Sequence, residues 1–399
     1  MRLHPMILAA LLPGMACAQG EAAQPVDQGP ANADYEPAFE NQTRAPKLPD
    51  TPVTVETLAE GLEHPWGIAP LPGGGHLVTE RPGRLRHIAA DGTLSEPIAG
   101  LPEIDARRQG GLLDVTLSPE FDADRMVYFT YAKKVDGGTA TAAGRGVLSD
   151  DLASLSQVED IWVQSPAADA PMHYGSRITF DGEGHVFVTT GEHFTDEYRE
   201  MAQTLDNTYG KVVRLNPDGS IPEDNPFVGQ DGMDEIWSYG HRNIQGAAVD
   251  PATGDYWTIE HGPAGGDELN RPEAGMNYGW PVVSYGLRYD GGPIGSGEPR
   301  REGMEEPVYY WDPVIAPGGM LFYEGAAFPE WEGDVLAASL VPGEVVRLTL
   351  EDGRVTGEQR LAGGNGRVRD VELTEDGEVL FLIDSEAGAV LRMAPDTSG

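Results

Sequence analysis

The sequence predicts an all-β fold, a six-bladed β-propeller of four-stranded antiparallel blades. Glycine makes up 52 of the 399 residues, about twice its usual share of ~7%. Stretches with helical periodicity are hard to find, whereas short alternating apolar runs recur, each closed by a turn. Similar units return roughly every 50 residues, the repeat length of propeller blades. A β-sandwich or barrel with long insertions is the alternative.

The repeated units share one composition. Each contains Val, Ile, Leu, Phe or Tyr and ends at Asp-Gly or Pro-Gly, which are typical of strands and hairpin turns. The units are residues 73–93, 182–193, 210–220, 252–262, 333–354 and 376–393. About six blades account for the domain that we place at residues 51–399. Because blades converge on one channel, loops distant in sequence are expected to share a pocket.

The amino terminus is typical of an export signal, which we place at residues 1–18 and which predicts a periplasmic protein. Its apolar centre, Met6–Leu12, is too short to span a membrane. Small residues at Ala16 and Ala18 provide a cleavage site. A lipid anchor through Cys17, the only cysteine, is the alternative. Without Cys17 the mature chain has no thiol, which excludes disulfides and cysteine nucleophiles.

Residues 19–50 are rich in Pro, Ala and acid and lack apolar periodicity, which predicts a disordered linker. The whole chain carries 65 Asp and Glu against 27 Lys and Arg, a formal net charge of −38. Long-range repulsion therefore opposes binding to nucleic acid or to anionic membranes.

Two stretches contain polar residues at the edges of predicted strands. Gln109 precedes two glycines and a strand, and a turn with a solvated Gln explains it equally well. His173 lies just before another strand, with Gly175 nearby to allow close approach. A neutral histidine is a suitable proton acceptor near pH 7. A structural histidine bonded to a backbone carbonyl is the alternative.

Positive charge is concentrated at two places in this acidic chain. Arg242 and Asn243 follow His241 in a glycine-bounded turn, and an arginine fork matches a carboxylate. Arg367 and Arg369 lie two apart in a strand, so they face the same side. Local positive charge predicts an anionic ligand, while ion pairs with nearby acids are the alternative.

The stretch 261–281 is rich in glycine and also carries Asp267 and Glu268. Exposed backbone carbonyls and carboxylates are hard oxygen ligands that suit Ca²⁺. The spacing is not that of an EF-hand, and a turn rich in surface acid is the alternative.

Taken together, the motifs resemble the soluble quinoprotein glucose/sorbosone dehydrogenase family, in particular its periplasmic aldose sugar dehydrogenases that depend on pyrroloquinoline quinone (PQQ). The resemblance runs from Leu58 to Met393. It rests on "HPWGI" (64–68), "QGGLLD" (109–114), "HYGSR" (173–177), "YGKVVRLNPDGSIPEDNPF" (209–227), "YGHRNIQG" (239–246), "EHGPAGGDELN" (260–270), "NYGWP" (277–281) and "RVRDV" (367–371). The family fold is a six-bladed β-propeller.

The resemblance implies a reaction, the oxidation of an aldose at C1 to the lactone. His173 matches the general base that takes the anomeric proton as hydride leaves for the quinone. Gln109 matches a residue that contacts substrate and cofactor. Glu192 stands where glucose-specific relatives carry a substrate-binding Asp. The expected partners are an aldose and an external electron acceptor, whether quinone, dye or cytochrome, and the protein is expected to be a monomer or homodimer.

The resemblance also implies PQQ and Ca²⁺ as cofactors. Arg242 and Asn243 match residues at the reactive carbonyl side of PQQ, and Arg367 and Arg369 match the pair that meets its carboxylates. The metal residues are Gly262 and Pro263, through backbone carbonyls, for the calcium that anchors PQQ, and Glu268 and Tyr278 for a second, structural calcium.

One departure concerns Val341, which stands where some family members place a pocket lysine, with Glu344 the only charge nearby. This predicts one lost cofactor contact. Two other functions remain open from the sequence. A calcium-dependent propeller hydrolase of the sugar-lactonase type would hold Ca²⁺ at the channel centre with carboxylates and Asn. A non-catalytic binding propeller would take up no cofactor.

Overall fold

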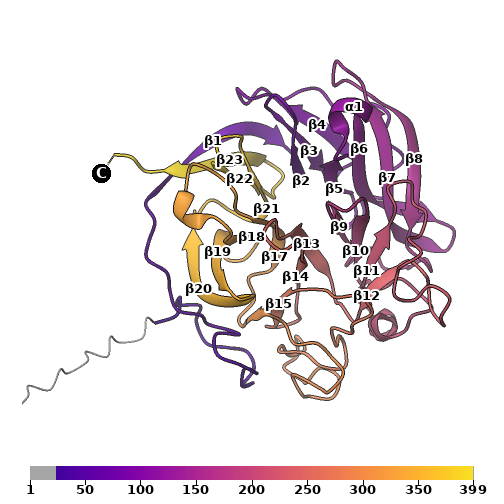
Figure 1. The fold of residues 1–399 in the computed structure, drawn as a ribbon, viewed down its shortest axis with the longest axis vertical. Helices are drawn as coiled ribbons and strands as arrows, with labels where there is room; N and C mark the ends of the chain where they lie inside the picture. Colours follow the sequence, from indigo (N-terminus) through magenta and orange to yellow (C-terminus); the bar gives the residue numbers. More distant parts are fainter. Residues whose placement is uncertain (1–23, 399) are drawn as a thin grey trace, which may run out of the picture.

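Six antiparallel sheets form a ring around a central channel in the computed structural model, which describes residues 24–398 (Figure 1). The predicted six-bladed β-propeller is confirmed. The first three blades contain β2 (Pro65–Pro70), β3 (His76–Glu80) and β4 (Arg84–Ile88); β5 (Leu112–Leu117), β6 (Met126–Val135), β7 (Gly138–Leu148) and β8 (Leu155–Val163); and β9 (Gly175–Phe180), β10 (Val186–Thr190), β11 (Lys211–Leu215) and β12 (Ile236–Tyr239).

The last three blades are built in the same order. They contain β13 (Ile244–Val249), β14 (Tyr256–Glu260), β15 (Asp267–Asn270) and β16 (Tyr309–Trp311); β17 (Pro317–Phe322), β18 (Val335–Ser339), β19 (Glu344–Glu351) and β20 (Arg354–Leu361); and β21 (Val368–Leu373), β22 (Val379–Ile383), β23 (Gly388–Pro395) and β1 (Val53–Leu62). The described helices are short: α1 (Phe121–Asp124), α2 (Asp196–Glu200) and the 3₁₀ turns η1 (Met201–Gln203) and η2 (Pro329–Trp331). No helix among the described residues is long and apolar enough to cross a membrane.

The amino-terminal strand closes the ring. β1 pairs antiparallel with β23 at the outer edge of the last blade, with Val53 opposite Pro395 and Val55 opposite Met393 (Figure 1). The propeller is therefore held shut by hydrogen bonds between the two ends of the domain.

The first blade departs from the four-stranded pattern, because its sheet has only β2, β3 and β4. An irregular segment replaces the fourth strand. Leu94 forms an isolated bridge with Ile88, and the backbone N–H groups of Ser95 and Ile98 donate to His87 and Leu85. The outer edge of β4 is thus partly satisfied without a regular strand.

The core lies between the blades. Apolar clusters fill the junctions of neighbouring sheets, such as Val78 with Leu380 between the first and last blades and Phe187 with Tyr256 between the third and fourth. Each blade covers a face of the next, so the middle strands β3, β10, β14, β18 and β22 are buried on both faces, whereas the outer strands are partly exposed.

The innermost strands decide where a site can form. In every blade the innermost strand contacts its counterparts in the neighbouring blades, in the cycle β2, β5, β9, β13, β17, β21 and back to β2. These strands start at the same end of the channel. Residues at six distant places in the sequence therefore meet at that end.

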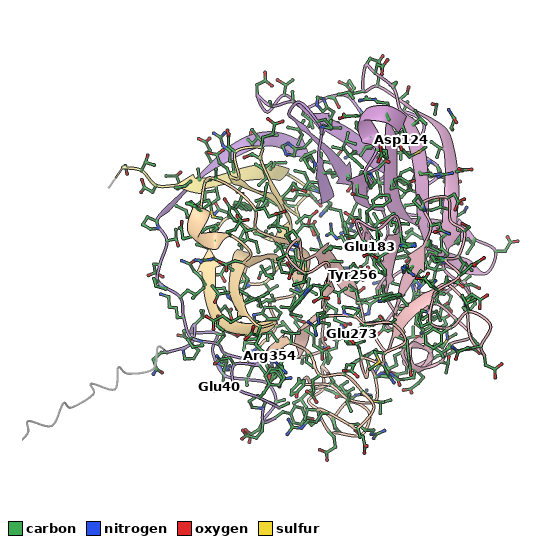
Figure 2. All side chains as sticks on the ribbon, in the orientation of Figure 1. Glu40, Asp124, Glu183, Tyr256, Glu273 and Arg354 are labelled. Carbon is green, nitrogen blue, oxygen red and sulfur yellow. The ribbon has the colours of Figure 1, made fainter. Side chains whose placement is uncertain are left out.

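Residues 24–50 differ from the linker expected from composition. Ala45 and Gln42 are buried, and the Gln42 amide donates to the carbonyl of Pro307. Arg354 lies over the Phe39 ring, 3.6 Å from its centroid, next to Glu40 in Figure 2. The segment has no apolar face to bury, and polar contacts hold it against the blades instead. The proposed signal peptide and Cys17 lie outside the described residues.

Candidate active site

A cavity of about 280 Å³, which we call the upper cavity, opens where the innermost strands start. Four residues expected in the cofactor site line it, namely Gln109, Asn243, Arg367 and Arg369. They come from the second, fourth and sixth blades, so the tertiary structure brings together residues up to 260 positions apart.

His173 is held next to this cavity by contacts at two of its atoms. Its backbone N–H donates to Oε1 of Gln109 at 2.8 Å, and its Nδ1 lies 2.8 Å from Oε2 of Glu192. The residue is only 5% exposed and has a left-handed backbone, with φ of 46°. Such a conformation in a non-glycine residue is uncommon and persists where the surroundings fix it.

Burial lowers the pKa of His173, and attraction to Glu192 opposes this effect. The imidazole is therefore neutral at pH 7. An ionised Glu192 accepts the proton on Nδ1, which leaves the lone pair on Nε2. The hydrogen bonds among the described residues do not use Nε2, so His173 can act as a proton acceptor at that atom.

Asn243 and Arg242 join the third and fourth blades. Oδ1 of Asn243 accepts from the backbone N–H of Gly175 at 3.0 Å. Arg242 donates from Nη1 to the carbonyls of His261 at 3.0 Å and Gly262 at 2.7 Å. Its guanidinium does not line the upper cavity but the wall of an adjoining one. The two neighbours in sequence thus serve different cavities.

Arg367, just before β21, and Arg369, within it, have different surroundings. Both side chains line the upper cavity, as the two-residue spacing predicts. Arg369 is buried and donates to Asp384, with Nη2 2.7 Å from Oδ2. Burial would raise the pKa of Asp384, but attraction to Arg369 and the hydrogen bond from His64 lower it to about 2. Arg369 is therefore already neutralised, whereas Arg367 is exposed.

Among the lining residues that the sequence did not predict are three charged or titratable ones near one another, Arg81, His64 and Asp384. Arg81 follows β3, and its buried Nε has no hydrogen-bond partner among the described residues. His64 places Nδ1 2.8 Å from Oδ1 of Asp384. The available signal was position: His64 just precedes an innermost strand, and Arg81 and Asp384 directly follow the second strands of their blades.

The residues expected to bind calcium are only partly free to do so. Gly262 offers a carbonyl that Arg242 already contacts. The Tyr278 hydroxyl donates to the carbonyl of Arg271 at 2.6 Å and accepts from the Glu273 N–H at 3.0 Å. Burial raises the pKa of Glu268 well above its usual range. No group of three or more His, Cys, Asp or Glu within residues 24–398 is poised around a metal position.

Comparison with known proteins decides the family. Residues 62–392 match the model of the glucose/sorbosone dehydrogenase family. The chain belongs to this family.

Its relatives include aldose sugar dehydrogenases. Aldose sugar dehydrogenase YliI of Escherichia coli is 42% identical over 350 residues, covering 86% of this chain and 93% of that protein. The apo-form structure of a soluble aldose sugar dehydrogenase from Escherichia coli has a TM-score of 0.83 at 41% identity and covers 86% and 99% of the two chains. The PQQ-bound aldose sugar dehydrogenase of Streptomyces coelicolor has a TM-score of 0.71 at 26% identity, covering 87% and 100%. The chain is therefore an enzyme of this family.

Val341, which is expected to stand where some family members carry a pocket lysine, brings no charge to the cavity. Val341 is 45% exposed, and its carbonyl accepts from the Ser339 hydroxyl. Glu344 is paired with Arg360 at 3.2 Å. The upper cavity receives its cationic groups from other blades, with Arg81 from the first and Arg367 and Arg369 from the sixth.

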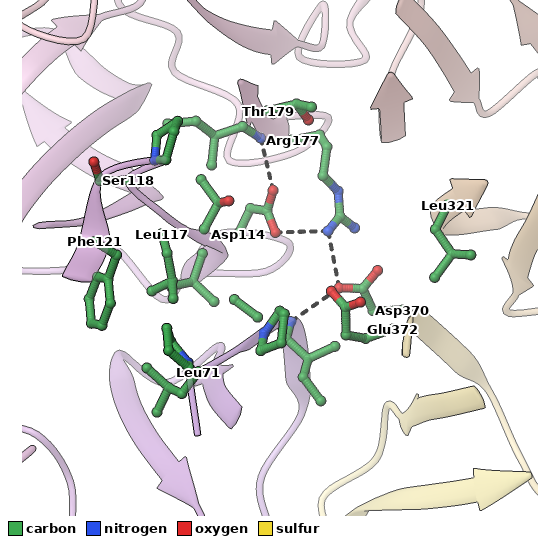
Figure 3. A pocket seen from close by; sticks show the side chains of 18 of the residues that line it. Leu71, Asp114, Leu117, Ser118, Phe121, Arg177, Thr179, Leu321, Asp370 and Glu372 are labelled. Atoms are coloured by element: carbon green, nitrogen blue, oxygen red, sulfur yellow. Dashed lines mark hydrogen bonds and ion pairs between the residues drawn. The ribbon is translucent and has the colours of Figure 1, made fainter. Parts of the chain in front are cut away.

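The opposite end of the channel holds a larger cavity of about 720 Å³, which we call the lower cavity (Figure 3). Arg177 donates from Nη1 to Asp114 at 2.8 Å and to Asp370 at 3.0 Å, and from Nε and Nη2 to the carbonyl of Gln245. It also lies over the ring of Trp66, which lines the upper cavity, at 4.6 Å. Arg177 and its two carboxylates thus separate the cavities.

Proposed function

We propose that this chain oxidises aldose sugars at C1 to the lactone, with PQQ as hydride acceptor and an external acceptor taking the electrons. The observation that carries the proposal is the His173–Glu192 pair beside a cavity lined with arginines. A buried neutral base next to a site for an anionic redox cofactor is the arrangement that hydride transfer from an alcohol requires.

The upper cavity fits PQQ, which has three carboxylates. Arg367 is exposed to the cavity, and the buried Nε of Arg81 lacks a partner that a carboxylate oxygen would provide. Arg369 adds a guanidinium fixed by Asp384 and by Oε1 of Gln245 at 3.0 Å. When bound, PQQ supplies the electrophilic carbonyl that takes up hydride. The arginines offset the long-range repulsion between a chain of net charge −38 and this anion.

His173 performs the proton step. Its Nε2 takes the proton of the anomeric hydroxyl, while the C1 hydrogen leaves as hydride and the C1–oxygen double bond of the lactone forms. Glu192 holds the imidazole through Nδ1 and stabilises the positive charge that His173 acquires. Gln109, bonded to the His173 backbone and lining the cavity, positions the base and is placed to contact the sugar.

Calcium would be held by backbone carbonyls of Gly262 and Pro263. A carbonyl oxygen has two lone pairs, so Gly262 can accept from Arg242 and face a cation as well. For the second, structural calcium we propose Glu268, whose buried carboxylate a cation would stabilise. Tyr278 fits this role poorly through its hydroxyl, because both hydrogen bonds of that group are already made within the chain.

Reconstitution tests the proposal. PQQ and Ca²⁺ are added to purified apoprotein, and an aldose panel is supplied with an artificial dye acceptor. Dye reduction that needs both additions is expected, and PQQ binding is followed by absorbance titration. The absence of both signals would direct the search to hydrolysis or partner binding. Against a lactonase site, the central carboxylates Asp114 and Asp370 are bound to Arg177.

We further propose that residues 1–18 direct export to the periplasm. The basic start, the short apolar run and the small residues before Gln19 support this. Amino-terminal sequencing of the exported protein distinguishes cleavage before Gln19 from a lipid anchor at Cys17. Size-exclusion chromatography with light scattering separates monomer from homodimer.

A further inference from the structure

A cavity of about 250 Å³, which we call the outer cavity, adjoins the proposed base. Phe194 lines it, and the Phe194 ring packs edge-on against the His173 imidazole with centroids 5.0 Å apart. The backbone N–H of Phe194 also donates to Oε2 of Glu192 at 2.6 Å. A ligand in the outer cavity is therefore separated from the catalytic pair by one side chain.

Three buried N–H donors in the walls of the outer cavity have no partner among the described residues. They are Nε of Arg199, Nε of Arg242 and Nε1 of Trp280. Arg242 is 4% exposed and Trp280 is 6% exposed. Leaving a buried donor unsatisfied destabilises the fold. Three such donors around one cavity indicate a ligand rich in acceptor oxygens.

The charge of the outer cavity favours an anion. Arg199 and Arg242 both lie over the Trp280 ring, at 5.9 and 5.1 Å from its centroid, and Arg288 completes a set of three arginines. The only acid in the lining is Asp290. Asp290 pairs with Arg288, and Asp196, outside the lining, pairs with Arg199 at 3.0 Å. Both carboxylates are exposed, and exposed pairs hold their partners weakly. This local excess of positive charge occurs in a chain with more than twice as many acids as bases.

The aromatic lining of the outer cavity favours a sugar ring. Trp280 and Phe194 supply aromatic surface, and Tyr289, which is 69% exposed, adds a ring at the edge. Aromatic walls with a few fixed polar donors are typical of small-molecule sites. The combination of apolar surface and guanidinium groups matches a sugar that also bears a carboxylate.

We propose that the outer cavity binds the carboxylate-bearing part of an acidic aldose, the chemical class of the uronic acids. The carboxylate accepts from Arg199 and Arg288, with the Trp280 N–H completing its hydrogen bonds, while C1 is directed toward His173. The binding part of the inference stands on the cavity alone. Oxidation of the bound sugar rests on the proposed dehydrogenase function.

Binding is tested on the purified apoprotein with two sugars blocked at C1. Methyl β-D-glucuronide and methyl β-D-glucoside differ only in carboxylate against hydroxymethyl at C6. Isothermal titration is expected to show about tenfold or more tighter binding of the glucuronide, as hydrogen bonds between charged groups predict. Arg199→Gln and Arg288→Gln each remove most of this preference, and Arg301→Gln, an exposed arginine outside the cavity, keeps it.

Equal affinities for the two glycosides, or a preference that survives in both cavity variants, would overturn the proposal. Thermal unfolding of each variant shows that loss of binding does not reflect loss of folding. The titration is repeated with PQQ and Ca²⁺ loaded. Glucuronide binding is expected to persist, and its disappearance would assign the outer cavity to the cofactor and overturn the sugar subsite.

Activity of the loaded enzyme separates this inference from the proposed function. A higher kcat/KM for D-glucuronate than for D-glucose, reduced in Arg199→Gln, supports both. Dye reduction with D-glucose but no glucuronide preference overturns the subsite alone. Glucuronide binding without any dye reduction supports the subsite and overturns the proposed oxidation.

Discussion

The charged groups at the two ends of the channel differ in whether they already have partners. The lower cavity is the larger, about 720 Å³ against about 280 Å³, and the charges buried at its inner end are bound to one another. Asp114 and Asp370 share the guanidinium of Arg177 (Figure 3). The upper cavity leaves Arg367 exposed and an N–H of Arg81 without a partner. Unused binding capacity, rather than volume, therefore distinguishes the cavity that we assign to the cofactor.

The same contrast extends to proton affinity. In the lower cavity burial raises the pKa of Glu372 to about 8, so this carboxyl is largely neutral at pH 7. Beside the upper cavity, attraction to His173 and Arg242 outweighs the burial of Glu192 and lowers its pKa. A carboxylate that stays ionised can orient a base, and a neutral carboxyl cannot do so as strongly.

The largest expected effect is on catalysis at the upper end. His173→Asn removes the proton acceptor while keeping a side chain of similar size, so dye reduction should fall by about 10²–10⁴-fold. Stopped-flow dye reduction with saturating PQQ measures it. Asp114→Asn in the lower cavity is the comparison, and a loss of similar size there would contradict the assignment of chemistry to the upper end.

The next effect is on stability at the lower end. Arg177→Met leaves Asp114 and Asp370 buried without their partner, which should cost about 3–5 kcal/mol of unfolding free energy. Urea denaturation at pH 7 measures this cost. Adding Asp114→Asn and Asp370→Asn removes the unpaired charges and should recover much of the loss. If Arg177→Met lowered the unfolding free energy by less than about 1 kcal/mol, the ion pairs of Arg177 would not be what stabilises this end of the channel.

A smaller effect is expected for an arginine of the upper cavity. Arg367→Met should change the unfolding free energy by no more than about 0.5 kcal/mol, because the side chain is exposed. It should weaken PQQ binding about tenfold through loss of a charge-assisted hydrogen bond. Arg354→Met, on the outer surface, is the matched control for charge (Figure 2). Unchanged PQQ affinity in Arg367→Met would remove this residue from the proposed cradle.

The smallest effect concerns pH and Glu372. Its folded pKa of about 8 lies above the unfolded value of about 4.3, so its contribution to stability is complete below pH 4. That contribution is lost as pH rises through 8. Glu372→Gln cannot ionise, so its Tm relative to the wild type should rise between pH 5 and pH 8.5. Parallel Tm curves for the two proteins over this range would contradict the raised pKa.

Sequence patterns were enough for the blades and brought four lining residues of the upper cavity into view, Gln109, Asn243, Arg367 and Arg369. The alternating runs at 182–193 and 376–393 became β10 and β22, and turn residues set their ends. The two-residue spacing of Arg367 and Arg369 correctly predicted that both face one cavity. These predictions succeeded because strand periodicity and turn chemistry are local properties.

Other features were not readable from the sequence. Composition predicted a linker at 19–50, but the described part contacts the blades, because Asn32 and Gln42 find partners more than 200 residues away. The irregular edge of the first blade, where Ser95 and Ile98 bond to β4, also escaped prediction. In both cases the stabilising partner is distant in sequence, so no local pattern records it.

The sequence by itself determined the strand repeat, the excess of negative charge and the presence of a histidine and arginines at strand starts. Only the tertiary structure decided how those charges are used. It paired Arg369 with Asp384, placed Arg177 with its two carboxylates between the cavities and brought Arg81 to the upper cavity. An ion pair depends on which side chains the ring places within about 4 Å of each other, and that distance is set by the packing of blades, not by spacing along the chain.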